Sequence, residues 1–347
     1  MLGIGRKTST SNTPAGDGRT LRVGVIGAGH FGRFHTLKVA ASPRATLCGL
    51  ADPDTTRAAG VAAEAARLGS SAVPVLDADA LIAASEAVIV AAPAAAHFEL
   101  AARALSAGRH VLVEKPIAAT LEEADALADI ASRSGCVLQV GHLLRYSAEH
   151  AAISARMRRP LYIEATRIAP FKPRGTDVSV ILDLMIHDLD LVLAIVDSPI
   201  EMVDAIGAAV TSPHEDIANA RVRFANGCVA TITASRISLK TERRMRLFSE
   251  EGYLSADFGA RELTMIGRDA GIPLPGTGGF RREVVSWQDH DTLAAEHDAF
   301  YAACLDGAPV VVDALAGRRA LEAALAVTDG IEAARRRMEL SGLIGTA

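Results

Sequence analysis

The sequence predicts an α/β protein whose N-terminal part forms a parallel sheet and whose C-terminal part is α+β, with an open, mostly antiparallel sheet. Between residues 21 and 141, short apolar runs alternate with alanine-rich helical segments. This rhythm is typical of a parallel sheet covered by helices on both faces. After residue 150, strand-like runs follow one another with short turns, as in an antiparallel sheet.

The strands expected in the first part are continuous apolar runs, which is typical of strands covered on both faces. They are LRVGVI, ATLCGLA, AVPVL, AVIVAA, HVLV and VLQV. Helices are expected in the alanine-rich segments between most of them. Because strands and helices alternate here, we expect one compact domain from residue 21 to residue 142.

The second part is predicted to form a separate domain over residues 143–347. A strand-like run, LYIEATRIA, precedes a helix that contains ILDLMIHDLD, and further strand-like runs fill residues 201–267. Asn226-Gly227 indicates a hairpin turn, and GIPLPGTGGF reads as a loop. Two closing helices are expected at roughly 290–306 and 312–338. Residues 1–20, rich in Ser, Thr, Gly and Pro, are expected to form a flexible tail.

Composition limits the classes of partner. The formal net charge is -5, whereas a general nucleic-acid surface needs a basic field. No apolar run has transmembrane length, and the first residues lack the apolar core of a secretory signal. The four cysteines form no CxxC pair, so we expect buried thiols in a reducing compartment and a cytoplasmic protein.

A glycine motif follows the first predicted strand. VGVIGAGHFGRFH places Gly27, Gly29 and Gly32 in GxGxxG spacing between a strand and a helix, the context required for a Rossmann dinucleotide site. The glycines would give a tight turn, close approach of a pyrophosphate and close helix packing, with the phosphates at the helix N-terminus. His30 and Phe31, inside the motif, are predicted to line the same site. The alternative is a glycine turn that binds no dinucleotide.

Asp52 ends the second predicted strand, 20 positions after Gly32. An acidic residue there accepts hydrogen bonds from the ribose hydroxyls and repels a 2′-phosphate, which favours NAD over NADP. Arg57 lies nearby but several residues into the next expected helix. NAD is therefore the predicted cofactor.

Glu114 and Lys115 follow the predicted strand HVLV, in the run EKP. Ligands of open α/β sheets bind outside the carboxyl ends of the strands, so Lys115 is expected at the mouth of the cleft. Pro116 would stiffen the turn that directs it. Position alone is equally consistent with a solvated Glu–Lys pair.

Asp183 and His187 lie four residues apart in the helix ILDLMIHDLD and would share a face. A carboxylate one turn away can orient an imidazole and stabilise its protonated form. His187 would then suit the removal of a proton from an alcohol. The other interpretation is an ordinary half-buried histidine near acids at a helix start. A metal site with Asp190 is disfavoured, because no cysteine or second histidine stands nearby in sequence.

The three motifs, GxGxxG, EKP and D-x-x-x-H in this order, resemble the Gfo/Idh/MocA family of NAD(P)-dependent sugar and polyol oxidoreductases. The resemblance spans essentially the whole chain after the tail. It implies that Lys115 hydrogen-bonds the substrate hydroxyl, that His187 is the base and Asp183 its partner, and that Pro93 and His97 lie near the nicotinamide. It also implies that residues 143–347 are the substrate and oligomerisation domain, and that a homodimer or homotetramer forms through the antiparallel sheet.

VGHLLRY, TRIAPF and DLMIHDLDLVLAIV resemble the branch of this family that oxidises the 3-hydroxyl of UDP-N-acetylglucosamine or its uronic acid. The resemblance implies a nucleotide-sugar substrate and a partner aminotransferase that converts the ketone to an amine, for lipid A or other surface-glycan synthesis. A basic loop, TRIAPFKPRGTD, which carries Arg167, Lys172 and Arg174, would match the UDP diphosphate. The predicted substrate contacts are Arg145, Tyr146, Arg167 and Arg174. We favour the plain UDP-N-acetylglucosamine, because no uronic-acid signature is recognised.

Two alternatives remain at this point. Another sugar, uronic-acid or inositol dehydrogenase of the family would not need a clamp formed by Arg167 and Arg174. A non-catalytic NAD-binding regulator built on the same fold could dispense with Lys115 or His187, yet both are present. Fold alone does not decide between these functions.

Overall fold

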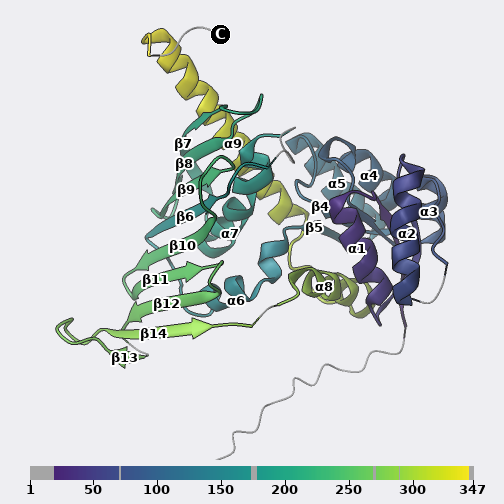
Figure 1. Cartoon of the computed structure of the whole chain (residues 1–347), viewed down its shortest axis with the longest axis horizontal. Coiled ribbons are helices and arrows are strands. Elements are labelled where there is room, and N and C mark those ends of the chain that lie inside the picture. The colour runs from purple at the N-terminus through teal and green to yellow at the C-terminus, as the bar shows by residue number, and fades with distance from the viewer. Residues whose placement is uncertain (1–18, 70–71, 173–177, 269–270, 289, 344–347) are drawn as a thin grey trace, which may run out of the picture.

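The computed structural model describes residues 19–69, 72–172, 178–268, 271–288 and 290–343. Two sheets face each other across a layer of helices, with the large sheet on the left of Figure 1 and the parallel sheet on the right. The predicted tail falls mostly outside the described residues. The predicted fold class, a parallel sheet followed by a mostly antiparallel one, is confirmed.

In the described residues the first sheet has five parallel strands, in the order β2-β1-β3-β4-β5. Because the strand order reverses between β1 and β3, this is the point at which ligands bind in such sheets. The strands are β1 (Leu21–Ile26), β2 (Ala45–Ala51), β3 (Ala87–Val90), β4 (His110–Glu114) and β5 (Leu138–Gly141). The helices are α1 (His30–Ala41), α2 (Thr55–Gly69), α3 (Ala78–Ala84), α4 (His97–Ser106) and α5 (Leu121–Ser134), with a short turn η1 (Ala94–Ala96) before α4.

The prediction of a strand at AVPVL is wrong. Within the described parts of the chain, the segment makes a single bridge, between Val75 and Leu50 of β2. The Leu50 N–H donates to the Pro74 carbonyl and the Leu76 N–H to the Leu50 carbonyl, but Pro74 has no N–H with which to extend a ladder. Three residues after Pro74, the Asp77 side chain accepts from the N–H of Ala80 and begins α3, a helix that the sequence reading missed.

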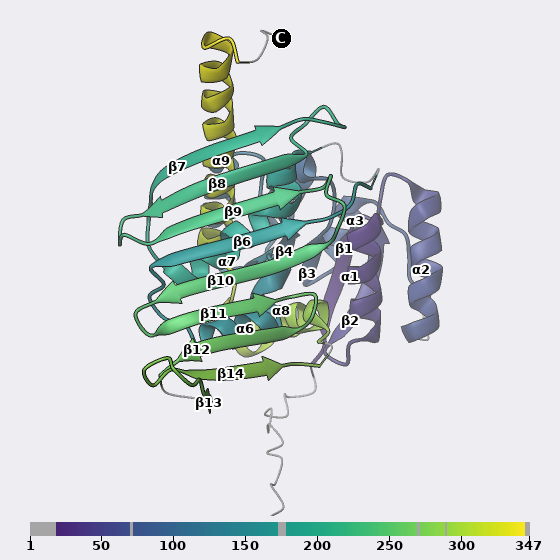
Figure 2. The same cartoon turned by 60° about the vertical axis from the view of Figure 1, so that its left-hand side comes forward.

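The second sheet has nine strands among the described residues, in the order β13-β14-β12-β11-β10-β6-β9-β8-β7 (Figure 2). All pairings are antiparallel except that of β6 with β9. The strands are β6 (Tyr162–Ile168), β7 (Ile200–Ala208), β8 (Ile217–Phe224), β9 (Val229–Ser235), β10 (Glu242–Ser249), β11 (Gly252–Asp257), β12 (Glu262–Gly267), β13 (Ile272–Pro273) and β14 (Arg281–Ser286). The hairpin turn predicted at Asn226-Gly227 is confirmed, and Gly227 has the positive φ of 88° that favours glycine. The reading missed β14, and the predicted loop at 271–280 contains β13.

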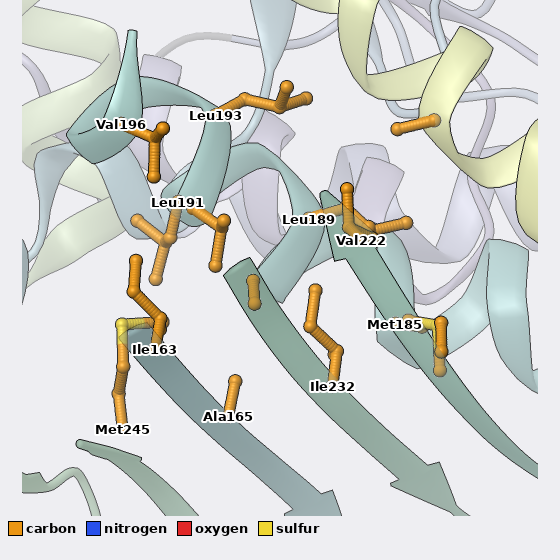
Figure 3. Packing of buried hydrophobic residues seen from close by; sticks show 14 of the residues in the cluster. Ile163, Ala165, Met185, Leu189, Leu191, Leu193, Val196, Val222, Ile232 and Met245 are labelled. Atoms are coloured by element: carbon orange, nitrogen blue, oxygen red, sulfur yellow. The ribbon is translucent and has the colours of Figure 1, made fainter. Parts of the chain in front are cut away.

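Among the residues that the structure describes, helices cover one face of this sheet. In β6 the buried residues alternate with partly exposed ones, and Ile163 and Ala165 point toward α7 (Ile186–Val196). Figure 3 shows these side chains beneath Leu189 and Leu191 of that helix. The period of two along the strand therefore matches a half-buried sheet.

The two closing helices are confirmed as α8 (Thr292–Asp306) and α9 (Ala314–Leu340). α9 packs against α7 and β7 on one side and against α5 on the other. α8 returns to the first sheet, where Phe300 and Tyr301 are fully buried in one cluster with Leu21 and Val23 of β1. The segment 143–347 predicted as a separate domain therefore supplies α8 to one core cluster of the first domain and Leu321 of α9 to another.

Short helical pieces connect the sheets and carry part of the site. They are η2 (Leu143–Tyr146), α6 (Ala148–Ser154) and η3 (Ile181–Met185). η3 is a π-helical turn that leads directly into α7, so the predicted helix over ILDLMIHDLD is present but begins with a wider turn. Such turns are frequent at functional sites.

The structure bears on two expectations drawn from composition: that the cysteines are buried thiols, and that no segment has transmembrane length. All four cysteines are free, but only Cys228 is buried, while Cys48, Cys136 and Cys304 are half-buried. The expectation of four buried thiols is therefore wrong for three of them. Within the described part of the chain, none of the helices combines the length and the apolar character that crossing a bilayer requires.

Candidate active site

The glycine turn between β1 and α1 has the geometry that a dinucleotide requires. Gly27 has φ 107°, and a Cβ on it would lie 2.4 Å from the carbonyl oxygen of Ala91. A Cβ on Gly32 would lie 2.0 Å from the carbonyl oxygen of Gly27, so α1 can approach the turn only because this residue is glycine. A Cβ on Gly29 would meet nothing within 4 Å, which leaves that side of the turn open to a ligand.

A cavity of about 1000 Å³ lies at the carboxyl edge of the parallel sheet, beside this turn. It extends from Asp52 at the end of β2 to Lys115 after β4. Its lining includes every residue that the sequence predicted for cofactor binding except Gly32, which lies beneath the turn. Those lining residues are Gly27, Gly29, His30, Phe31, Asp52, Pro93, His97, Glu114 and Lys115.

Asp52 is held in place by the backbone around it. One carboxylate oxygen accepts from the Ala28 N–H at 2.6 Å, and the other from the Asp54 N–H at 2.8 Å and from Nη2 of Arg57 at 2.7 Å. Burial alone would raise the pKa of Asp52, but these hydrogen bonds outweigh burial and lower it. An ionised carboxylate here suits ribose hydroxyls. The sequence reading set Arg57 aside as too far along the next helix, whereas its guanidinium contacts Asp52 directly.

Lys115 connects the dinucleotide cavity to the helix layer of the second sheet. Its Nζ donates to the carbonyl oxygens of Asp183 at 2.9 Å and Leu182 at 3.2 Å, both in η3. The peptide bond from Lys115 to Pro116 is cis. His97 lies behind it, with its ring nitrogens 2.7 Å from the Pro116 carbonyl oxygen and 2.8 Å from that of Ala92. His97 thus holds the Lys115 turn against the loop after β3.

His187 lies in the first turn of α7, just after η3. Its Nδ1 is buried and has no hydrogen-bond partner among the described residues, while the ring as a whole is partly exposed. Burial, and then the positive charge of Lys115, hold the pKa of His187 well below its usual value. The imidazole is therefore neutral, which is the form that accepts a proton.

The predicted role of Asp183 needs a correction. We expected its carboxylate to orient His187 and to stabilise the protonated ring. Instead, Oδ1 of Asp183 lies 4.0 Å from Nζ of Lys115, and the structure gives no hydrogen bond between Asp183 and His187 within its described residues. Asp183 therefore acts on Lys115 in this conformation, and positive neighbours favour the neutral form of His187.

The other acids of ILDLMIHDLD have structural partners. Asp188 accepts two hydrogen bonds from Arg167, at 2.7 and 2.8 Å, and both residues are buried. Asp190 lies 3.3 Å from a guanidinium nitrogen of Arg145 and 3.9 Å from Nδ1 of His142. The negative charges of Asp188 and Asp190 are thus neutralised by arginines of β6 and η2.

Three predicted substrate contacts are therefore engaged or buried inside the protein. Arg145 and Arg167 pair with buried acids, which makes them structural ion-pair partners rather than available phosphate clamps. The Tyr146 hydroxyl is buried as well, and burial raises the pKa of this phenol. Arg174, the fourth, lies outside the described residues.

A buried polar cluster behind Glu114 was missed by the sequence reading. Oε1 of Glu114 lies 2.8 Å from Nε2 of His35, whose Nδ1 lies 2.8 Å from Nε2 of His297. Burial, and then the neighbouring Glu114, raise the pKa of the Glu296 carboxyl well above its usual value. His35, Glu114 and Glu296 each place one ligand atom within 4.8 Å of the others, a spacing that a metal ion could bridge. Both ring nitrogens of His35 are already in hydrogen bonds, so we assign the cluster to positioning Glu114.

A dinucleotide cavity, a lysine at its mouth and a neutral histidine beside that lysine define an NAD-binding oxidoreductase. Residues 21–142 match the family described as oxidoreductases with an NAD-binding Rossmann fold, and residues 151–255 match its C-terminal domain. The chain belongs to the Gfo/Idh/MocA oxidoreductase family. The predictions of family and of NAD as cofactor are thereby confirmed.

Particular relatives narrow the comparison. The chain is 44% identical over 321 residues to the UDP-N-acetylglucosamine 3-dehydrogenase of Acidithiobacillus ferrooxidans, covering 91% of this chain and 99% of that protein. A solved structure of that enzyme superposes with a TM-score of 0.84, covering 90% of this chain and 98% of the other. Scyllo-inositol dehydrogenase from Lactobacillus casei, solved with NAD(H) and scyllo-inositol, is similar with a TM-score of 0.73, covering 90% of this chain and 97% of the other. At 20% identity it shares the fold.

Proposed function

We propose that the protein oxidises the 3-hydroxyl of UDP-N-acetylglucosamine to a ketone, with NAD as the hydride acceptor. The 44% identity to an enzyme of that name over nearly its whole length supports the substrate. The observation that carries the chemistry is the contact of Lys115, at the end of the NAD cavity, with the carbonyls of Leu182 and Asp183, one turn before His187.

The proposed mechanism uses the neutral state of His187. The imidazole accepts the proton of the substrate hydroxyl, and the Lys115 ammonium donates a hydrogen bond to the same oxygen and stabilises its developing negative charge. NAD, when bound, supplies the hydride acceptor. Because burial and Lys115 lower the pKa of His187, the proton that it accepts is readily passed on to solvent, and the base is regenerated for the next cycle.

The roles of Lys115 and His187 are tested by replacing each of them. Lys115→Met and His187→Asn should abolish NADH formation with UDP-N-acetylglucosamine and leave NAD binding largely intact. Lys240→Met and His214→Asn, at exposed positions outside the cavity, are the matched controls and should turn over normally. Normal turnover in either active-site variant would contradict the proposed mechanism.

The substrate is tested by mass spectrometry of the sugar nucleotide after incubation with the protein and excess NAD. An aminotransferase and an amino donor trap the ketone, so the expected product is a UDP amino sugar that forms only when this protein is present. NAD binding without such a product would reject UDP-N-acetylglucosamine. The corresponding uronic acid, free sugars and inositols would then be tried in the same assay by NADH absorbance.

The cellular setting is proposed on the same basis. We propose that the ketone passes to an aminotransferase in the cytoplasm, for lipid A or another surface glycan.

We also propose a homodimer or homotetramer that associates through the open face of the nine-stranded sheet, where Met202 and Ile206 of β7 are exposed. We propose that the chain divides into two domains, residues 21–142 and residues 143–347, and that α8 of the second packs against the first. Light scattering on the full chain would measure the mass of the assembly.

A further inference from the structure

Arg243 of strand β10 lies on the face of the large sheet that the helices cover. Met245 and Leu247 are fully buried on the face of the sheet that the helices cover. Arg244 and Arg246 lie on the other face, where each pairs with an acidic residue. Since side chains alternate along a strand, Arg243 belongs to the covered face with Met245 and Leu247, at the end of the strand where this cover stops.

Arg243 faces another arginine rather than an acid. It is the antiparallel partner of Arg167 in β6, so the two side chains are neighbours on one face. Arg167 is neutralised by two hydrogen bonds to Asp188, whereas the guanidinium of Arg243 makes no ion pair or hydrogen bond with the residues that the structure describes, and its backbone carbonyl accepts from the Phe258 N–H. The side chain of Arg243 is exposed at this end of the strand. Partial desolvation, and then the neighbouring Arg167, lower its pKa, while Asp188 acts in the opposite direction.

Arg243 lies near the proposed catalytic base, His187. Arg243 pairs across the sheet with Arg167, and Arg167 hydrogen-bonds Asp188, the residue that follows His187. The positive charge of Arg243 is accordingly among those that lower the pKa of His187, together with those of Lys115 and Arg167. The charged groups that act on Arg243 itself are Arg167 from β6 and Asp188 from α7. An anion bound by Arg243 would therefore lie near the hydroxyl that His187 deprotonates, and it would offset the excess of positive charge around that site.

We propose that Arg243 binds the diphosphate of the nucleotide-sugar substrate. The proposal rests on the function proposed above, because it identifies the group that recognises the anionic part of that substrate. A guanidinium can bind two phosphate oxygens at once. Arg145 and Arg167 are held by buried acids, while Arg243 has its donors available. The arginine that the sequence reading did not select is thus the one suited to the role.

Binding of UDP to the NADH-loaded protein tests the proposal without turnover. Isothermal titration calorimetry should give a dissociation constant for UDP that is roughly ten- to a hundredfold higher in Arg243→Gln than in the unaltered protein, as expected for loss of a charged hydrogen-bonding group. Arg244→Gln is the matched control, since the adjacent arginine points to the other face and pairs with Asp257. It should bind UDP with unchanged affinity. Equal affinities in the two variants, or no UDP binding by the unaltered protein, would overturn the assignment.

The pH dependence of turnover gives a second, independent measurement. Since Arg243 lowers the pKa of His187, Arg243→Gln should move the acid limb of kcat/KM to higher pH, and Arg244→Gln should not. Thermal unfolding of both variants verifies that they are folded. An unshifted limb would count against the proposed location of Arg243.

Failure of this proposal can be distinguished from failure of the proposed function. UDP binding that depends on Arg243, without oxidation of UDP-N-acetylglucosamine, would reject the proposed reaction and keep the diphosphate site. Oxidation of UDP-N-acetylglucosamine, together with UDP binding that does not depend on Arg243, would keep the proposed reaction and reject the diphosphate site at Arg243.

Discussion

Replacing Gly32 with alanine should weaken both the fold and NAD binding. The added Cβ would lie 2.0 Å from the carbonyl oxygen and 2.6 Å from the carbonyl carbon of Gly27. Both are backbone atoms of a turn that is itself fixed by the contact of Gly27 with Ala91, so no flexible side chain can move aside. To reach an ordinary contact of 3.4 Å, α1 and the turn must separate by about 1.4 Å.

Overpacking of this kind costs roughly 1–3 kcal/mol, so the midpoint of thermal unfolding should fall by several degrees. The dissociation constant for NAD should rise at least about tenfold, because the helix N-terminus that faces the pyrophosphate moves away from it. Differential scanning fluorimetry and an NAD titration by tryptophan or nucleotide fluorescence measure the two effects on the same samples.

Two other glycines serve as controls for Gly32→Ala. Gly29→Ala should unfold like the unaltered protein, since its Cβ meets nothing in the protein within 4 Å, yet it should bind NAD weakly because the methyl group enters the space for the pyrophosphate. Gly60→Ala, at an exposed position inside α2 with open space around it, should raise stability by roughly 0.5–1 kcal/mol. Unchanged stability and NAD affinity in Gly32→Ala would refute the argument that α1 packs closely only because of glycine.

Three further predictions concern buried charge. Because positive neighbours and burial lower the pKa of His187, kcat/KM should stay flat as pH falls through about 6.5 and decline only below it; a decline that begins above pH 7 would contradict this. Asp188→Asn should lower the free energy of unfolding by about 3–5 kcal/mol in urea titrations, since it leaves Arg167 buried without its carboxylate; a loss below about 1 kcal/mol would count against a buried pair. Glu296 keeps its proton in the folded state above the pH at which the unfolded chain releases it, so stability is lost as pH rises above about 4.5. Glu296→Gln should therefore unfold at an increasingly higher temperature than the unaltered protein between pH 5 and pH 8, whereas a constant difference would exclude this linkage.

Sequence reasoning succeeded where the signal is local. The strands of the parallel sheet are continuous apolar runs, and the glycine turn depends on spacing within six residues, so both were predictable. AVPVL has strand composition, but Pro74 prevents a ladder, and Asp77 is a helix cap whose signal was available and was not used. β14 was missed because its run RREVVS is short and charged, with half-buried and exposed residues alternating along it.

The partners of the charged residues could not be predicted, because tertiary packing sets them. Asp188 meets Arg167 only because α7 lies across β6, and 21 residues separate the two in sequence. His35 meets His297 across 262 residues. The same packing explains why arginines chosen by their proximity in sequence to the helix proved to be engaged, while Arg243 was identified only from the register of β10.

The return of α8 to the first sheet has a consequence for attempts to exchange cofactor preference between relatives. A fragment that stops at residue 142 contains all five parallel strands and the glycine turn. It would nevertheless lack Phe300 and Tyr301, and its β1 core would be open to water where these rings now lie. A chimaera that grafts the NAD half of one family member onto another therefore needs residues 292–306 from the same parent, or the apolar surface left bare will favour aggregation over folding.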